Sequence, residues 1–348
     1  MSRNQGGQVQ RDDLDYCYEA VGDVSRTFAL TVAELDEPMS SDICVGYLLC
    51  RVADTVEDAS HIPPADQSAL LATFSDVLDP DDETTAAEFR ADVDEWIPEN
   101  PDADWDVVAS TPRVVSAFDG LDPSSQAAIR PPVRELVDGM AMFVDRYADA
   151  GGLRLETFDE LEEYCWYAAG TVGTLVTGLL SRNVDDSVRE TLQNNARSFA
   201  MLLQLVNVTK DVVTDYEEED NVYLPQELLE AEDLEPSDIP DERNSEAFVP
   251  VVGRVRERAE SYLNGAQAWL DAMPEIRGNT LSAWAIPFLL AVATLRELED
   301  RPEDVIREGD VKVSRSEVHA LLETFSGGNE PNVADLRAKI RKQPIDEF

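Results

Sequence analysis

Apolar side chains recur along the chain at intervals of three and four residues, and an alternation with period two is nowhere sustained. This spacing is typical of amphipathic helices. Clusters of Pro, Gly and Asp interrupt it at residues 79–83, 98–104, 119–125, 149–152, 224–244 and 326–332. The pattern predicts an all-α protein of eight to ten helical segments without an internal repeat. We expect a flexible N-terminus over residues 1–14, one domain over 15–325 and a C-terminal tail over 326–348.

One acidic group follows an almost entirely apolar run over residues 46–52. In a helix, Asp54 and Asp58 stand one turn apart on the same face, and Glu57 lies three residues after Asp54. Like charges at this spacing repel each other, so the group needs a bound cation or solvent to compensate it. A solvated acidic face is the alternative interpretation in a chain with so many carboxylates.

A second acidic group repeats the spacing far along the chain. Asp211 and Asp215 end a mainly apolar stretch over residues 196–215, and Gln204 and Asn207 continue the same polar stripe. Polar groups on a buried helix have to be paired. If the two helices face each other, four aspartates surround one cavity. Mg²⁺, with Mn²⁺ as an alternative ion, is the natural partner of such oxygen ligands and of substrate phosphates.

Two arginines and two glycines add to this picture. Arg26 and Arg51 lie where basic residues are scarce, either as anion contacts or as surface ion pairs. Gly170 and Gly173 interrupt an aromatic and apolar helix over residues 164–180. Each glycine costs about 1 kcal/mol inside a helix, so the pair calls for close packing or for a ligand. Packing alone would suffice.

The charge balance excludes some functions. The 348 residues include 72 acidic and 28 basic ones, a net charge of −44. No basic surface is available for nucleic acid or for steering to an anionic membrane. An acidic excess spread along the chain is tolerable where salt screens it, so a halophilic source is a hypothesis. A stability that is indifferent to salt would contradict it.

Composition also bears on the compartment and on metal chemistry. The cysteines lie mostly in apolar surroundings without metal-type spacing, which predicts buried thiols in a reducing compartment: Cys17, Cys44, Cys50 and Cys165. His61 and His319 are too few for a histidine metal site or a serine–histidine triad. The N-terminus lacks a signal-peptide core, and the apolar run 281–295 is too short to span a bilayer. We expect a soluble, monomeric, cytoplasmic protein that is at most peripheral at the membrane.

Several of these motifs together resemble the squalene/phytoene synthase family of head-to-head prenyl transferases. The resemblance extends over about residues 15–320 and is carried by five elements, Ser25–Phe28, Tyr47–Asp58, Tyr164–Gly173, Gln204–Asp215 and Tyr223–Pro225. It implies a single-domain class I isoprenoid synthase bundle around a central apolar cavity. Residues 285–287, 291–295 and 305–309, with Lys312 soon after, are more similar to the squalene branch than to the phytoene branch.

The resemblance implies condensation of two farnesyl diphosphates through presqualene diphosphate to squalene, with reduction by NADPH. It implies that Mg²⁺ is bound by Asp54, Asp58, Asp211 and Asp215, with Tyr164 and Arg51 as further catalytic residues. The implied substrate contacts are Ser25, Arg26, Phe28, Tyr47, Gln204, Asn207 and Lys210. Arg307 and Lys312 are the implied NADPH contacts, and this cofactor rests on the resemblance alone because no dinucleotide fingerprint is present.

The chain departs from the family pattern at the second acidic group. Lys210 stands where the family usually has arginine, and the acidic residues 216–221 replace a basic, glycine-rich loop. Lysine provides a point charge but not the bidentate fork of a guanidinium. Two alternatives remain beside the squalene-forming reaction: a phytoene or dehydrosqualene synthase without the reductive step, and a non-catalytic helical scaffold with acidic faces adapted to salt.

Overall fold

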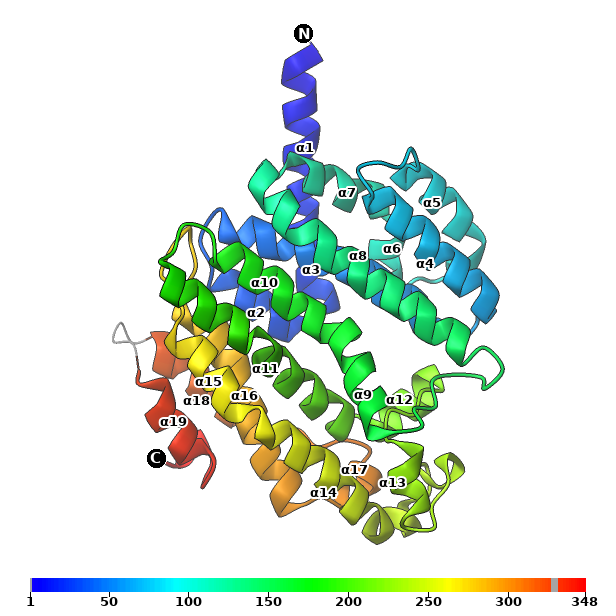
Figure 1. Cartoon of the computed structure of the whole chain (residues 1–348), viewed down its shortest axis with the longest axis vertical. Coiled ribbons are helices and arrows are strands. Elements are labelled where there is room, and N and C mark those ends of the chain that lie inside the picture. The colour runs from blue at the N-terminus through cyan, green and yellow to red at the C-terminus, as the bar shows by residue number, and fades with distance from the viewer. Residues whose placement is uncertain (1, 327–330) are drawn as a thin grey trace. The chain divides into compact units, whose positions relative to one another are not determined.

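The computed structural model describes residues 2–326 and 331–348, and within them the side chains of all residues except 2–8, 26 and 27. In this part of the chain, all regular secondary-structure elements are helices (Figure 1). Its one β-type pairing is an isolated parallel bridge between Arg154 and Val222. The prediction of an all-α fold is confirmed. The prediction of eight to ten segments is wrong, because the described residues form nineteen α-helices, several of only one or two turns.

The helices belong to two compact units, each assembled from separate stretches of the chain. The first unit comprises residues 1–149, 167–189 and 274–280. Its helices are α1 (Ser2–Val24), α2 (Arg26–Ala33), α3 (Met39–Glu57), α4 (Pro64–Leu78), α5 (Ala86–Val93), η1 (Asp94–Trp96), α6 (Ala103–Ala109), α7 (Thr111–Gly120), α8 (Pro123–Arg146) and α10 (Thr171–Leu180).

The second unit comprises residues 150–166, 190–273 and 281–348. The α-helices that belong to it wholly or mostly are α9 (Phe158–Cys165), α11 (Asp186–Lys210), α12 (Val212–Glu219), α13 (Gln226–Glu230), α14 (Ser245–Ser261), α15 (Leu263–Asp271), α16 (Leu281–Asp300), α17 (Asp304–Arg307), α18 (Arg315–Ser326) and α19 (Val333–Ile340). Short 3₁₀ turns join them at η3 (Pro236–Asp238), η4 (Glu242–Asn244) and η5 (Ile345–Glu347).

Helix α3 is the centre of the first unit. It packs against α1, α2, α4, α6, α7, α8 and α10, and most of its residues are buried. A helix that is apolar on most of its circumference has to be surrounded by others, which agrees with the apolar run before Asp54. The four cysteines are buried free thiols, as predicted. Burial raises the pKa of the Cys17 thiol to about 12, so it stays protonated.

Helix α16 has the same role in the second unit. It packs against α14, α15, α18 and α19, and its Trp284 meets the Trp269 ring edge-on at 5.9 Å. By length and composition, α16 is the single helix in the described part of the chain that could cross a membrane. About 72% of its most apolar window is buried inside the protein, which agrees with the predicted buried helix.

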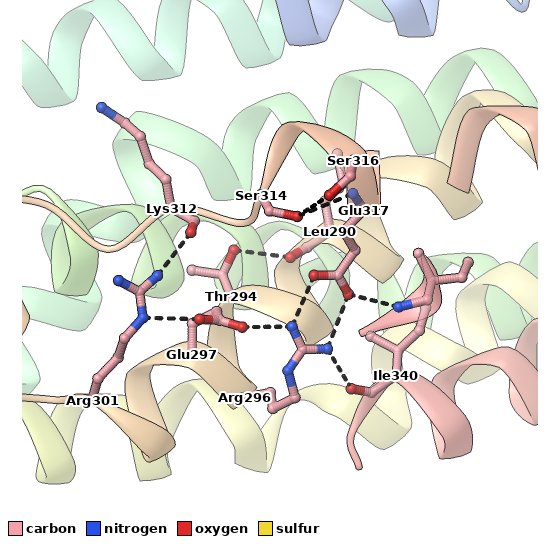
Figure 2. Close-up of polar contacts among 11 residues, drawn as sticks. Leu290, Thr294, Arg296, Glu297, Arg301, Lys312, Ser314, Ser316, Glu317 and Ile340 are labelled. Carbon is pink, nitrogen blue, oxygen red and sulfur yellow. Dashed lines mark hydrogen bonds and ion pairs between the residues drawn. The ribbon is translucent and has the colours of Figure 1, made fainter. Parts of the chain in front are cut away.

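The expected C-terminal tail is folded. Helix α19 packs on α16, and the Arg296 guanidinium donates to the carbonyl oxygen of Ile340 at 2.9 Å and to Glu317 Oε1 at 3.0 Å (Figure 2). Glu317 Oε1 also accepts from the backbone N–H of Ile345 at 3.2 Å. The buried ion pair between Arg296 and Glu317 joins α16 to α18, and the hydrogen bonds of these two residues to Ile340 and Ile345 attach the C-terminal segment to the second unit. Local composition gives no sign of these contacts.

Helix α1 begins at Ser2, and the flexibility of the N-terminal residues stays a prediction. Arg113, on α7, anchors the middle part of α1 by hydrogen bonds. The guanidinium donates to Asp13 Oδ1 at 3.0 Å and to the carbonyl oxygen of Asp12 at 2.9 Å. Since this partner lies about a hundred residues away, the polar composition of the first residues gave no sign of the contact.

Candidate active site

The first acidic group lies at the C-terminal end of α3, in the first unit. Asp58 is the C-cap residue, and its N–H donates to the carbonyl oxygen of Asp54 at 2.9 Å. The two carboxylates therefore come from adjacent turns, as the spacing predicts. Burial raises the pKa of Asp54 to about 6, while the Arg51 charge opposes this shift and the Asp104 carboxylate adds to it. Asp54 is a carboxylate that lacks much of its hydration and gains from a bound cation.

Arg51 lies one turn before Asp54 and is held from two sides. Its Nε is 3.1 Å from Oδ1 of Asp104, and its guanidinium carbon lies 6.0 Å from the centre of the Tyr47 ring. Burial acts to lower the pKa of Arg51, but its interactions with the Tyr47 hydroxyl and the Asp54 and Asp104 carboxylates raise the pKa overall, so the guanidinium remains charged. A fixed cation beside a carboxylate on one helix is suited to binding the oxygens of a diphosphate.

The aromatic part of this site comes from α2 and α3. Ser25 caps α2, and its hydroxyl oxygen accepts from the N–H of Phe28 at 3.2 Å. This cap places the Phe28 ring 3.9 Å from the Tyr47 ring with an interplanar angle of 17°. The structure thus brings four predicted residues together in the first unit: Ser25, Phe28, Tyr47 and Arg51. The side chain of Arg26 lies outside the described residues.

The second acidic group, in the second unit, is not a continuation of one helix, and that prediction is wrong. Helix α11 ends at Lys210 and α12 begins at Val212, with Asp211 between them at φ −103° and ψ 16°. The N–H of Asp211 still donates to Asn207 and its carbonyl oxygen accepts from the N–H of Asp215. Lys210 Nζ forms an ion pair with the carboxylate of the adjacent Asp211. Asn207 is exposed and Gln204 is half-buried.

Asp215 experiences the strongest accumulation of negative charge in the site. Burial raises its pKa to about 8, and the carboxylates of Glu219 and Asp211 add to the shift, while Lys210 opposes it. At neutral pH without a cation, this side chain is therefore protonated. The expected acidic loop after it is also different, because α12 continues to Glu219 and ends at Asp220 in the left-handed region, with φ 56°.

Lys312 belongs electrostatically to the second acidic group. It pairs with Asp310, and the Asp211 charge contributes, after Asp310, to the rise in its pKa. Its carbonyl oxygen accepts from Arg301 at 2.9 Å, and Arg301 is in turn held by Glu297 at 2.9 Å (Figure 2). Arg307 pairs with Asp304 at 3.5 Å on α17. Because Lys312 lies near Asp211, its ammonium group is as well suited to bind a substrate diphosphate there as to bind a phosphate of NADPH.

Tyr164 is buried in α9, where a helix irregularity follows it. Residues 166–170 form a π-helical turn, η2, that ends at Gly170, and such turns are frequent at functional sites. The Tyr164 ring stacks on the Tyr223 ring, with centroids 5.0 Å apart, and the two hydroxyl oxygens are 3.2 Å apart. Gly170 thus ends the π-helical turn, and Gly173 lies in the first turn of the α-helix that follows it.

Sequence reasoning assigned no role to Asp104, Arg154 or Asn221. Asp104, on α6, pairs with Arg51 from a polar stretch that carries no motif. Arg154 binds both the carboxylate and the carbonyl oxygen of Asp220. Asn221 is buried between them and Tyr223. These contacts join distant parts of the chain, and no periodic pattern signals them.

The donor chemistry fits Mg²⁺. Each acidic group presents carboxylate oxygens with perturbed ionisation, and no histidine or cysteine takes part. The described residues contain no cluster of three or more His, Cys, Asp or Glu side chains that could hold an ion. This is compatible with Mg²⁺, which is commonly bound through one or two carboxylates together with waters and substrate phosphates.

Comparison with known proteins gives a consistent result. A family model described as squalene/phytoene synthase matches residues 21–317. Botryococcus squalene synthase from Botryococcus braunii is 28% identical over 318 residues, which cover 89% of this chain and 62% of that protein. The chain spans 62% and 64% of the first two curated relatives.

The solved structures show the same fold. A complex of TcSQS with a ligand matches with a TM-score of 0.77 at 24% identity, covering 95% of this chain and 89% of that chain. A dehydrosqualene synthase in complex with a ligand matches with a TM-score of 0.61 at 18% identity, covering 97% of this chain and 100% of that chain. At these identities, the likeness establishes the helical architecture alone.

Proposed function

Because the chain belongs to the squalene/phytoene synthase family, we propose that it condenses two farnesyl diphosphates head to head, through presqualene diphosphate, to squalene. The proposal includes Mg²⁺ as the resident ion, with Mn²⁺ able to replace it, and NADPH as the hydride donor. The curated relatives of the squalene branch support the choice of reaction. Non-reductive condensation to a phytoene-like or dehydrosqualene-like product is the second candidate, which the dehydrosqualene synthase fold match favours.

The arrangement of Arg51, Asp54 and Tyr47 is the observation that carries this proposal. Departure of a diphosphate leaves a negative charge to be stabilised and an allylic cation to be protected from water. In the first unit, a charged guanidinium lies next to a half-buried carboxylate and an aromatic pair. In this assignment Arg51 would contact the anion, Asp54 would hold the metal ion, and the aromatic faces would stabilise the cation.

The second unit offers a similar set of charges. Asp211 and Asp215 would hold Mg²⁺, and Lys210 and Lys312 would contact phosphate oxygens. Bound Mg²⁺ supplies positive charge that neutralises the departing diphosphate. In our assignment the buried Tyr164, on α9, would help to remove a proton from the substrate or to stabilise its cation. In our assignment Gln204 and Asn207 contact substrate and Arg307 contacts NADPH.

The decisive experiment is product identification. Purified protein is incubated with farnesyl or geranylgeranyl diphosphate and Mg²⁺, with and without NADPH, and the hydrocarbon is identified. Squalene that forms only with NADPH supports the proposed reaction. Phytoene from the C20 substrate, or a non-reduced C30 product from farnesyl diphosphate, supports the second candidate. Absence of any product at every salt concentration would point to a non-catalytic scaffold and overturn both.

The surroundings of the protein are part of the proposal. With a net charge of −44, the chain would repel itself at low ionic strength, so we propose a high-salt cytoplasm, a monomeric state and transient contact with the membrane for product release. Thermal unfolding between low and molar KCl tests the first point. A melting temperature that does not rise with KCl concentration contradicts it.

A further inference from the structure

The hydroxyl of Tyr164 belongs to a chain of hydrogen bonds within the second unit. Its oxygen is 3.2 Å from the hydroxyl oxygen of Tyr223, which is itself 3.2 Å from Nδ2 of Asn221. All three side chains are buried, with 4%, 8% and 5% of their surface exposed. Buried polar groups of this kind are held in one arrangement by their partners.

The orientation of the Asn221 amide is fixed by its other contacts. The backbone N–H of Leu153 can only donate, and it lies 2.9 Å from Oδ1 of Asn221. The amide nitrogen must therefore point the other way, where it meets the Tyr223 hydroxyl and, at 3.3 Å, a carboxylate oxygen of Glu219. Since an amide nitrogen donates, the Tyr223 oxygen accepts from Asn221, and it shares a further hydrogen bond with the Tyr164 hydroxyl in which either oxygen can be the donor.

The backbone around Asn221 is clamped on both sides. Arg154 binds the carboxylate and the carbonyl oxygen of Asp220, and the N–H of Val222 donates to the carbonyl oxygen of Leu153 at 2.8 Å. A Cβ atom on Gly152 would lie 2.0 Å from the carbonyl oxygen of Asp220, so only glycine allows this approach. The end of the acidic segment is therefore a fixed support for Asn221.

We propose that Asn221 and Tyr223 are positioning residues that hold the Tyr164 hydroxyl in place. The chain links the Leu153 N–H to Asn221, Asn221 to Tyr223, and Tyr223 to Tyr164. Because the Asn221 amide is fixed, it holds the Tyr223 hydroxyl, which in turn fixes the position of the Tyr164 oxygen. The catalytic part of this inference rests on the proposed function, in which Tyr164 acts on the substrate.

Three isosteric substitutions test the chain. Tyr164→Phe and Tyr223→Phe each delete one hydroxyl and keep the stacked ring, while Asn221→Asp keeps the acceptor for Leu153 and removes the donor to Tyr223. We expect kcat to fall about a hundredfold in Tyr164→Phe and about tenfold in each of the other two, with KM unchanged. Tyr262→Phe is the matched control, because its hydroxyl binds Glu162 in the same unit and takes no part in the chain.

Double variants separate positioning from a merely structural role. If Asn221 acts through the Tyr164 hydroxyl, Asn221→Asp added to Tyr164→Phe costs nothing further, and the double variant stays near a hundredfold loss. Independent effects would multiply to about a thousandfold. Multiplied losses, or an unchanged kcat in any of the three folded single variants, overturn the proposal. Thermal unfolding of each variant verifies that it is folded.

A second readout does not need activity. 3-Fluorotyrosine is incorporated at position 164, and its ¹⁹F resonance reports the hydrogen bonding of the hydroxyl. We expect Tyr223→Phe and Asn221→Asp to shift this resonance and Tyr262→Phe to leave it in place. If the wild type forms no hydrocarbon, the proposed function fails, and the resonance alone decides whether the chain exists. A resonance that neither variant moves overturns the chain itself.

Discussion

Two acidic groups with the same spacing are built differently. Asp54 and Asp58 end one continuous, buried helix, with Arg51 one turn before them. Asp211 and Asp215 lie across a helix break, and the adjacent Lys210 binds Asp211. The first group is preorganised by packing, because seven helices of its unit pack against α3. The second is held by charges, and its geometry depends on their balance.

The carboxylate pKa values express this difference. The pKa of Asp54 is raised to about 6, mainly by burial, and Arg51 opposes the shift. The pKa of Asp215 is raised to about 8, first by burial and then by three neighbouring carboxylates, while Lys210 opposes the shift. The second group therefore has the greater need of a divalent cation, and variation of charge should affect it more than variation of packing.

Removal of one carboxylate from either group should have the largest effect. We expect Asp54→Asn and Asp211→Asn each to lower kcat about a thousandfold or more, because a neutral amide is a poor ligand for Mg²⁺ beside a diphosphate. The fold should survive in both. Steady-state kinetics with farnesyl diphosphate and thermal unfolding provide the measurements, and near-normal turnover in either variant would remove that residue from the metal site.

The pH dependence of Mg²⁺ binding should separate the two groups. In the metal-free folded protein, Asp54 and Asp215 keep their protons up to pH values of about 6 and 8, and Mg²⁺ must displace them. Affinity therefore rises with pH. Between pH 6 and pH 8 the ionised fraction of Asp215 grows about fiftyfold and that of Asp54 about twofold, so we expect Mg²⁺ affinity to increase up to about fiftyfold at the second group and about twofold at the first. Isothermal titration with MgCl₂ measures it.

The same carboxyl groups affect stability in the opposite direction. Below their raised folded-state pKa they bind protons that the unfolded chain releases near pH 4, so the unfolding free energy of the metal-free protein falls as pH rises from about 4 to 8. Asp215→Asn should flatten both this slope above pH 6 and the slope of Mg²⁺ affinity. If the variant retains the wild-type slopes, another group titrates in this range.

Exchange of the first group's arginine should have the next largest effect. Arg51→Lys keeps the charge but loses the Nε contact to Asp104 and the planar fork, so we expect kcat/KM to fall about tenfold to a hundredfold. Asp104→Asn is the companion variant, since it leaves Arg51 in place without its ion-pair partner. A smaller loss in Asp104→Asn than in Arg51→Lys is expected, and the reverse order would assign the main role to Asp104.

The first group could be predicted from the sequence because its information is local. Residues 47, 51, 54 and 58 follow one another at helical spacing, so a single continuous helix places them on one face. The capping Ser25 and the aromatic Phe28 were marked by the family resemblance. Asp104 could not be predicted, since its pairing with Arg51 depends on how α6 packs against α3.

The second group shows where local information ends. The apolar spacing through residue 210 is correct for α11, but nothing in it marks the break at Asp211. The acidic residues after Asp215 were expected to form a loop and are mostly helical, ending where Arg154 binds Asp220. That partner lies 66 residues earlier in the chain. The helix break at Asp211 and the binding of Asp220 by Arg154 both depend on tertiary contacts that override the local sequence pattern.

The smallest expected effect is also the most direct comparison of the two groups. Lys210→Arg gives the second group the guanidinium that the first has in Arg51. The Lys210 ammonium is paired with Asp211, and a planar fork could bind that carboxylate and a phosphate oxygen together. We expect kcat/KM to change by no more than about fivefold, with an increase if phosphate contact limits the reaction. A fall beyond tenfold would show that the second group has been built around the smaller, single-point charge, and that its acidic neighbours and Lys210 form one adapted unit.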